Sequence, residues 1–158
     1  DETIRRLFHA CRRNRLEFLL EIIPSKVAPV TDQTSADLIQ HIYDLGVYPD
    51  WWKLEPLATA AAWDAASAAI TRNDPHVRGV VVLGLDAPEA ALAAGLQLAA
   101  RTPLVKGFAV GRTIFADAAR GWMKGGMTDG EAVAMMAERY ARLCGIWDQA
   151  RAAAQADS

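Results

Sequence analysis

Three charged residues stand near the ends of short apolar segments, where they could carry out covalent carbonyl chemistry. Lys53 and Glu55 lie within Trp51-Trp-Lys-Leu-Glu-Pro56, and Glu21 lies near the end of the apolar segment Leu16–Ile23. A lysine can form an imine with a ketone when its amine is neutral, a form that burial and a nearby cation such as Lys26 favour. A carboxylate beside that amine can move protons. The competing interpretation is a structural ion pair of Lys53 with Glu21 or Glu55.

A second group of residues fits a phosphate site. Gly111-Arg112-Thr113 follows an apolar segment and opens a helical pattern, so backbone N–H groups, the helix dipole and the guanidinium could bind one anion. Gly84, at the end of the preceding apolar segment, would let the backbone approach the same phosphate. For both glycines the alternative is an ordinary turn. The predicted substrate-binding set also includes three other residues: Asp86, Lys26 and Trp51.

These residues must be positioned by elements that alternate along the chain. Strands are expected at residues 16–23, 51–55, 77–85 and 104–110. Helices are expected at residues 2–14, 34–45 and 57–71, from Asp86-Ala-Pro-Glu89 onward, from Gly111 to about Met123, and from the capping box Thr128-Asp-Gly-Glu131 to about Ala153. Alternating strands and helices predict an α/β fold with a parallel sheet.

Two architectures have this element order: an open doubly wound sheet, and part of a (β/α)8 TIM barrel. The first strand alternates Glu17 and Glu21 with apolar residues, which suits a barrel whose acids point into the lumen and whose apolar face packs under helices. The sequence contains no Gly-x-Gly-x-x-Gly fingerprint for a nucleotide. A barrel needs eight strands, so residues 1–158 are expected to be about half of one, with the active site at the carboxyl ends of the strands.

The composition is that of an ordinary globular protein. The chain has 158 residues, of which 52% are apolar and 23% charged, with a net charge of −2 that gives no reason to expect a nucleic-acid partner. No apolar run is long enough for a membrane span, and the two cysteines, Cys11 and Cys144, are expected to be free thiols. We therefore expect a cytoplasmic protein. No spacing of His, Cys and Asp predicts a metal site, and no cofactor is expected.

Four stretches of the chain resemble a known family. They are Leu16–Lys26, Pro49–Pro56, Arg78–Pro88 and Val105–Phe115, and the most specific pieces are Trp-Trp-Lys-Leu-Glu-Pro and Gly-Arg-Thr-Ile-Phe. The resemblance is to the aldolase-like domain fused behind the sugar kinase, 5-dehydro-2-deoxygluconokinase, of bacterial myo-inositol catabolism. That domain is in turn similar to the class I tagatose-1,6-bisphosphate aldolases.

The resemblance implies roles for individual residues. Lys53, followed by Glu55, matches the Schiff-base lysine; Glu21 matches the acid/base; Arg112 matches the phosphate-binding arginine. The implied reaction cleaves 2-deoxy-5-keto-gluconate 6-phosphate to dihydroxyacetone phosphate and malonate semialdehyde. The family also uses Asp and Lys groups from the first barrel strands, which have no counterpart here. The chain is thus expected to be the C-terminal half of the barrel, completed by a fused N-terminal half and kinase or by self-association.

Two other functional classes compete with the aldolase. One is a non-catalytic domain that binds a phosphorylated sugar or sugar acid and regulates or dimerises an attached kinase. The other is a metal-dependent aldolase or isomerase.

Overall fold

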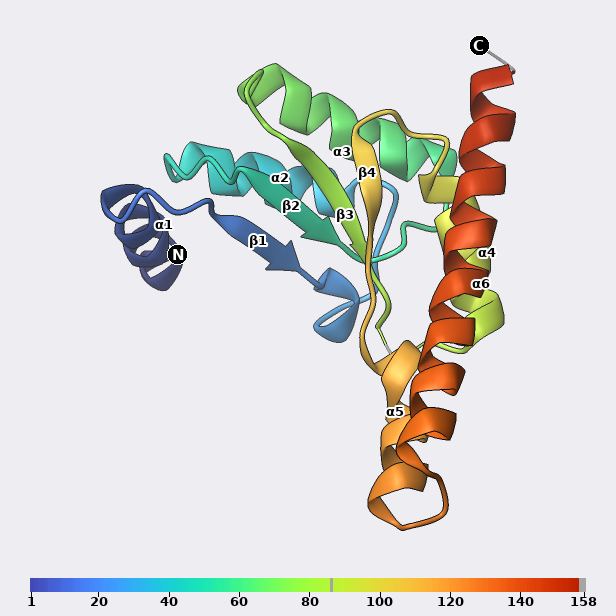
Figure 1. The fold of residues 1–158 in the computed structure, drawn as a ribbon. Coiled ribbons are helices and arrows are strands. Elements are labelled where there is room, and N and C mark those ends of the chain that lie inside the picture. The colour runs from blue at the N-terminus through green and yellow to red at the C-terminus, as the bar shows by residue number, and fades with distance from the viewer. Residues whose placement is uncertain (86, 157–158) are drawn as a thin grey trace.

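The computed structural model describes residues 1–85 and 87–156, and its centre is a sheet of four parallel strands (Figure 1). The strands follow one another across the sheet in chain order: β1 (Leu19–Ile22), β2 (Trp51–Leu54), β3 (Gly79–Leu83) and β4 (Val105–Ala109). Consecutive parallel strands with a helix between each pair are the repeating unit of a (β/α)8 barrel. The predicted α/β class with a parallel sheet is confirmed.

The described residues form six α-helices besides the strands: α1 (Glu2–Arg13), α2 (Thr34–Asp44), α3 (Ala60–Asn73), α4 (Glu89–Ala99), α5 (Arg112–Met123) and α6 (Asp129–Ala156). A 3-10 turn, η1 (Pro24–Lys26), follows β1. The capping box predicted for the last helix is confirmed, because the N–H of Thr128 donates to Glu131 at 2.8 Å and the N–H of Glu131 donates to the Thr128 hydroxyl at 3.3 Å. The expected cap at Asp86 lies outside the described residues.

Helices cover only one face of the sheet. In Figure 1, α2 and α3 lie behind the strands, α4 and α6 run beside β4, and the face toward the viewer is open. The covered face contributes Trp52, Leu54, Val80 and Val82 to the core, each at most 2% exposed. A doubly wound sheet has helices on both faces, so one-sided cover decides between the two expected architectures in favour of part of a barrel.

The first strand is shorter than expected. Residues 16–23 were predicted, but β1 begins at Leu19, and Leu16 is 59% exposed instead of lying on the covered face. The cause is the end of α1: Arg15 has a φ of 55°, and the N–H of Leu16 still bonds to the carbonyl of Cys11 at 2.9 Å. The chain is therefore still leaving the helix where a strand was expected.

The other boundaries differ by small shifts. β3 starts at Gly79 instead of residue 77, and β4 is one residue shorter at each end than expected. α3 begins at Ala60 instead of Leu57, because the hydroxyl of Thr59 accepts the N–H of Ala62 at 3.1 Å and caps the helix there. Each shift moves an end of an element and leaves the order of strands and helices unchanged.

Candidate active site at the carboxyl ends of the strands

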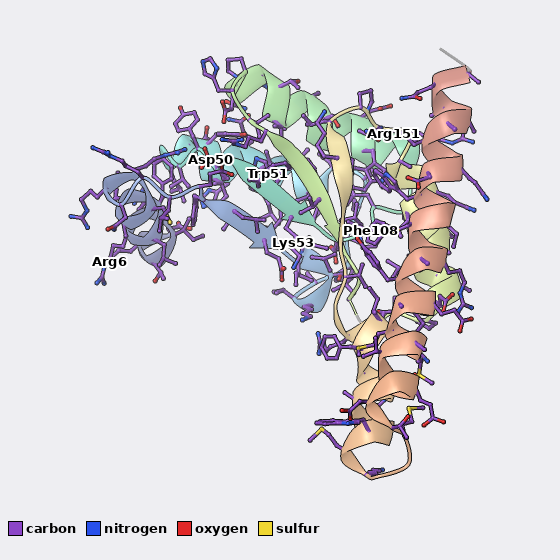
Figure 2. The ribbon with its side chains drawn as sticks, viewed as in Figure 1. Arg6, Asp50, Trp51, Lys53, Phe108 and Arg151 are labelled. Carbon is purple, nitrogen blue, oxygen red and sulfur yellow. The ribbon has the colours of Figure 1, made fainter. Side chains whose placement is uncertain are left out.

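Lys53 and Glu21 meet on the open face of the sheet. They are register partners on the paired strands β2 and β1, so their side chains project from the same face. Lys53 Nζ lies 2.7 Å from Glu21 Oε2, and the two side chains are 24% and 40% exposed. Figure 2 shows Lys53 near the centre of this face, between β1 and β3. The predicted juxtaposition of these two residues is confirmed, in the form of an ion pair.

The ion pair lies in a cavity of about 220 Å³ at the carboxyl ends of the strands. Its lining comes from all four strand ends and from the start of α5: Glu21, Ile23, Lys26, Lys53, Leu83, Gly84, Leu85, Ala109, Val110, Gly111, Arg112, Thr113 and Phe115. The set combines three cations and one carboxylate with apolar side chains. A carbonyl compound carrying an anionic group would meet both a lysine amine and separate cations here.

The start of α5 supplies another part of the cavity lining. Gly111 is the N-cap residue, and its carbonyl accepts the first helical bonds from Ile114 at 2.8 Å and Phe115 at 3.1 Å. The N–H groups that open a helix have no partner within it, and the helix dipole adds positive potential there. Arg112 is exposed at this point and lines the cavity. The predicted phosphate-site residues Gly111 and Arg112 therefore lie at a helix start beside the cavity, and their role in binding an anion stays a prediction.

Gly84 is buried at the end of β3 for a packing reason. A Cβ at this position would lie 2.9 Å from Val110 Cγ1 and 3.4 Å from the hydroxyl of Thr113. The missing side chain lets the loop from β4 to α5 pack against the end of β3. Gly84 therefore holds the start of α5 close to the cavity. The sequence predicted the glycine's place in the site and missed this contact.

Glu55 belongs to the neighbouring loop. It directly follows β2, is 4% exposed, and is bonded to Ser25 through both carboxylate oxygens: Oε1 accepts the N–H at 3.1 Å, and Oε2 accepts the hydroxyl in a short hydrogen bond. It lines a separate cavity of about 200 Å³ with residues of the β1–α2 and β2–α3 loops. Strand parity alone would predict that Glu55 shares the face of Lys53, two residues before it. That prediction is wrong, because β2 ends at Leu54.

Trp51 is also separated from the cavity. It lies two residues before Lys53 on β2, toward the amino end of the strand, and its indole N–H donates to Glu17 Oε2 at 2.9 Å. Glu17 also pairs with Arg78 at 2.7 Å. The structure thus places Trp51 in a polar cluster at the opposite end of the strands, away from the cavity of Lys53. Asp86, also predicted to bind substrate, lies outside the described residues.

Several lining residues were not predicted. Leu83 and Ala109 lie on the same face as Lys53, since their register follows that of Val81 and Gly107 by two residues. Strand parity could have identified them once the face of Lys53 was chosen. Phe115 belongs to the Gly-Arg-Thr-Ile-Phe stretch and its ring lies 3.2 Å from the position of a Cβ on Gly111. These apolar groups form the walls of the cavity.

Larger hollows lie away from these residues. One of about 680 Å³ follows the outer side of α1, and one of about 490 Å³ lies between α3 and the turn before β4. Neither brings a lysine and a carboxylate into contact. A third, of about 530 Å³, adjoins the start of α5 on its other side and contains Arg112, Arg120 and Arg139. Two of these arginines bind Asp117, and their hydrogen bonds hold the pKa of its carboxyl below the ordinary value.

Within residues 1–85 and 87–156, no three His, Cys, Asp or Glu side chains are grouped closely enough to hold a metal ion. Both cysteines are free and half-buried. No helix in the described part of the chain combines the length and the apolar character needed to cross a membrane.

A family described as "Uncharacterized protein conserved in bacteria (DUF2090)" matches residues 1–151. The chain belongs to this DUF2090 family. No curated protein matches the sequence.

A solved structure shares the fold. It is a fructose-bisphosphate aldolase from Plasmodium falciparum, solved with TRAP and a small-molecule inhibitor, with a TM-score of 0.63 and 18% sequence identity. The match covers 94% of this chain and 49% of the aldolase chain, so this DUF2090 chain spans about half the length of that aldolase. The DUF2090 chain therefore has an aldolase-like fold.

Proposed function

We propose that this DUF2090 chain carries the Schiff-base half of a class I aldolase that acts on a phosphorylated keto-sugar acid. The observation that carries the proposal is the 2.7 Å contact between Lys53 and Glu21 inside a cavity that also holds Lys26 and Arg112. A lysine beside a proton-transfer group, with cations for an anionic substrate, is what imine chemistry on a sugar phosphate needs.

The Lys53–Glu21 contact supports a proton path for the first step. Transfer of one proton from the ammonium to Glu21 leaves a neutral amine, whose lone pair attacks the ketone carbon. The ketone oxygen takes a proton from the attacking nitrogen and becomes a hydroxyl. Glu21 then returns its own proton to this hydroxyl, which leaves as water, and the C–N bond becomes an iminium. Without Glu21, Lys53 would have to exchange this proton with solvent.

The same two residues serve carbon–carbon cleavage. Glu21, again a carboxylate, takes the proton of the hydroxyl on the carbon that becomes the aldehyde. The electron pair of the breaking C–C bond moves into the iminium of Lys53 and forms an enamine. Protonation of the enamine and addition of water release the ketone product and restore the amine. For 2-deoxy-5-keto-gluconate 6-phosphate, the products are malonate semialdehyde and dihydroxyacetone phosphate.

The two other cations that line the cavity, Lys26 and Arg112, support recognition of an acid with a phosphate. Arg112, Gly111 and the N–H groups that open α5 are placed to bind the phosphate. Lys26, from η1, lines the same cavity and can bind the second anionic group. Binding of these remote groups orients the ketone toward Lys53, and misplacing it would reduce the rate of cleavage.

We further propose that residues 1–158 form the C-terminal half of a (β/α)8 barrel. The open sheet face and the unpaired outer edges of β1 and β4 support this, as exposed strand edges recruit further strands. Large apolar side chains are exposed along both flanks: Leu7, Leu16 and Leu19 near β1, and Phe115, Trp122 and Met123 on α5. The second half comes from an N-terminal half-barrel fused with a kinase in a cytoplasmic enzyme, or from a second copy of the chain.

A retro-aldol assay tests the catalytic proposal. With 2-deoxy-5-keto-gluconate 6-phosphate as substrate, we expect the full protein to release dihydroxyacetone phosphate, and Lys53→Met to abolish release. Glu21→Gln should lower kcat by about 10²–10⁴-fold, the usual contribution of an acid/base group. Lys106→Met is the matched control, since Lys106 is exposed and bonds to the carbonyl of Pro103 far from the cavity. Full activity of Lys53→Met would refute the proposal.

The second candidate is a non-catalytic phosphosugar-binding domain that regulates or dimerises an attached kinase. The observation that favours it is the same ion pair, because a lysine neutralised by Glu21 is a stable structural arrangement. This candidate predicts that the protein binds dihydroxyacetone phosphate but does not cleave 2-deoxy-5-keto-gluconate 6-phosphate. It also predicts that Lys53→Met leaves phosphate binding intact. For a metal-dependent enzyme, activity would be lost on exhaustive chelation.

A further inference from the structure

The loop between β1 and α2 carries Lys26 to the cavity. Beyond η1, residues 27–33 are exposed and outside any helix or strand. The turn itself is held by local bonds, with the N–H groups of Val27 and Ala28 donating to the carbonyl of Pro24 at 2.9 and 3.2 Å. These bonds shape η1 itself. They do not connect η1 to the strands that carry Lys53.

The attachment comes from Glu55. Its carboxylate accepts two hydrogen bonds from Ser25, one from the backbone N–H at 3.1 Å and one from the hydroxyl. Glu55 is 4% exposed and rigidly placed, because it directly follows β2. A buried carboxylate costs free energy unless it is hydrogen-bonded, and within the described residues Ser25 is the partner that meets this need.

We infer that Glu55 is a positioning residue: through Ser25 it fixes η1 so that Lys26 is held at the cavity of Lys53. Ser25 and Lys26 are consecutive, so fixing the N–H and hydroxyl of the first determines where the backbone of the second begins. The same loop is attached at its other end by the hydroxyl of Thr59, which donates to Asp32 at 2.7 Å. This role rests on the proposed function only in treating Lys26 as the group that binds a substrate anion.

A positioning role and a direct catalytic role predict different kinetics. If Glu55 acts through Lys26, Glu55→Ala raises KM about 10-fold, the equivalent of losing a hydrogen bond to a charged group, and changes kcat less than about twofold. Glu55→Gln stays within about twofold of the wild type, since its amide can accept the N–H of Ser25 and donate to the hydroxyl. If Glu55 instead transfers a proton to substrate, Glu55→Gln lowers kcat by about 10²–10⁴-fold, which overturns the inference.

A double-variant cycle identifies the residue through which Glu55 acts. In a Lys26→Met background, the loss of Glu55 should add less than about twofold to KM, because the cation it positions is already gone. Fully additive effects would overturn the inference, since a general loss of structure affects KM whether or not Lys26 is present. Ser25→Ala is a second variant for the case that Glu55→Ala does not fold, because Ser25 is exposed and the change removes only the hydroxyl bond.

Hydrogen–deuterium exchange of the unliganded protein tests the inference independently of any activity. In Glu55→Ala, the amide of Ser25 should exchange at least about 10-fold faster than in the wild type, because its hydrogen bond is lost. Asp32→Ala, at the far end of the loop, is the control and should leave that amide unchanged. Unchanged exchange in Glu55→Ala would overturn the inference. If the Ser25 amide exchanges faster in Glu55→Ala but the wild type has no aldolase activity, the proposed function is refuted and the positioning role of Glu55 stands.

Discussion

Replacing Gly84 by alanine tests how the end of β3 holds the start of α5. The added Cβ would lie 2.9 Å from Val110 Cγ1, whereas carbon atoms in contact normally sit about 3.5–4.0 Å apart. Val110 or the backbone beside it must therefore move by about 0.6 Å. The hydroxyl of Thr113, buried without a hydrogen-bond partner among the described residues, lies 3.4 Å from the same Cβ. The new methyl group would therefore push against Val110 and Thr113, the residues on either side of the start of α5.

The expected cost follows from overpacking. Adding a methyl group to a well-packed site destabilises a protein by about 1–3 kcal/mol. At about 2 kcal/mol, Tm would fall by about 4–8 °C for a domain of this size. Because the shift moves Gly111 and Arg112, we also expect phosphate to bind several-fold more weakly to Gly84→Ala.

Urea unfolding followed by tryptophan fluorescence measures the stability change, since Trp52 and Trp63 are buried in the core. Gly107→Ala is the matched control on the adjacent strand, where a new Cβ meets nothing within 4 Å. That variant should be neutral or more stable by about 0.5 kcal/mol, because alanine restricts the unfolded chain. Equal stability of Gly84→Ala and Gly107→Ala would refute the packing argument.

Three further predictions concern the scaffold. Burial raises the pKa of Asp50, but the N–H of Phe18 at 2.7 Å and the guanidinium of Arg12 at 3.1 Å lower it more, so the net pKa is below the ordinary value. The resulting stabilisation is present above about pH 4 and is lost as the pH falls through the lowered pKa, so Asp50→Asn should lose about 1–3 kcal/mol of urea stability at pH 7 and progressively less as the pH is lowered below about 4. Burial raises the pKa of Tyr43 to about 12, so absorbance titration should show this tyrosine un-ionised at pH 11, and a normal titration near pH 10 would contradict it. Arg151 donates to three backbone carbonyls before and within β4, at 2.7–3.2 Å, so Arg151→Ala should lower Tm measurably while the exposed Arg101→Ala does not.

Much of the fold could be predicted, because strand and helix periods are strong signals in this chain. Near-continuous apolar segments ending at Gly84 and Gly111 indicated two buried parallel strands. Both were found, as were the two strands predicted before them in the chain. What the pattern could not predict was where β1 begins. Leu16 and Phe18 have the same parity and the same apolar character, and only the left-handed turn at Arg15 separates an exposed residue from a buried one.

The site was predictable where side chains project from paired strands. Glu21 and Lys53 are register partners, so parity alone put them on one face. The same reasoning failed for Glu55, because parity has no meaning after β2 ends at Leu54. It also failed for Trp51, which shares the parity of Lys53 but lies about 7 Å away along the strand, toward its amino end. Contacts made by loops, such as that of Ser25 with Glu55, leave no periodic signal in a sequence.

Imine trapping at Lys53 tests the central claim most directly. The protein is incubated with dihydroxyacetone phosphate, reduced with borohydride, digested and analysed by mass spectrometry. We predict a covalent adduct on Lys53 that is lost in Lys53→Arg, weakened in Glu21→Gln and unchanged in Lys106→Met. The absence of an adduct, or equal labelling of Lys26, Lys106 and Lys124, would contradict the assignment of Lys53 as the nucleophile.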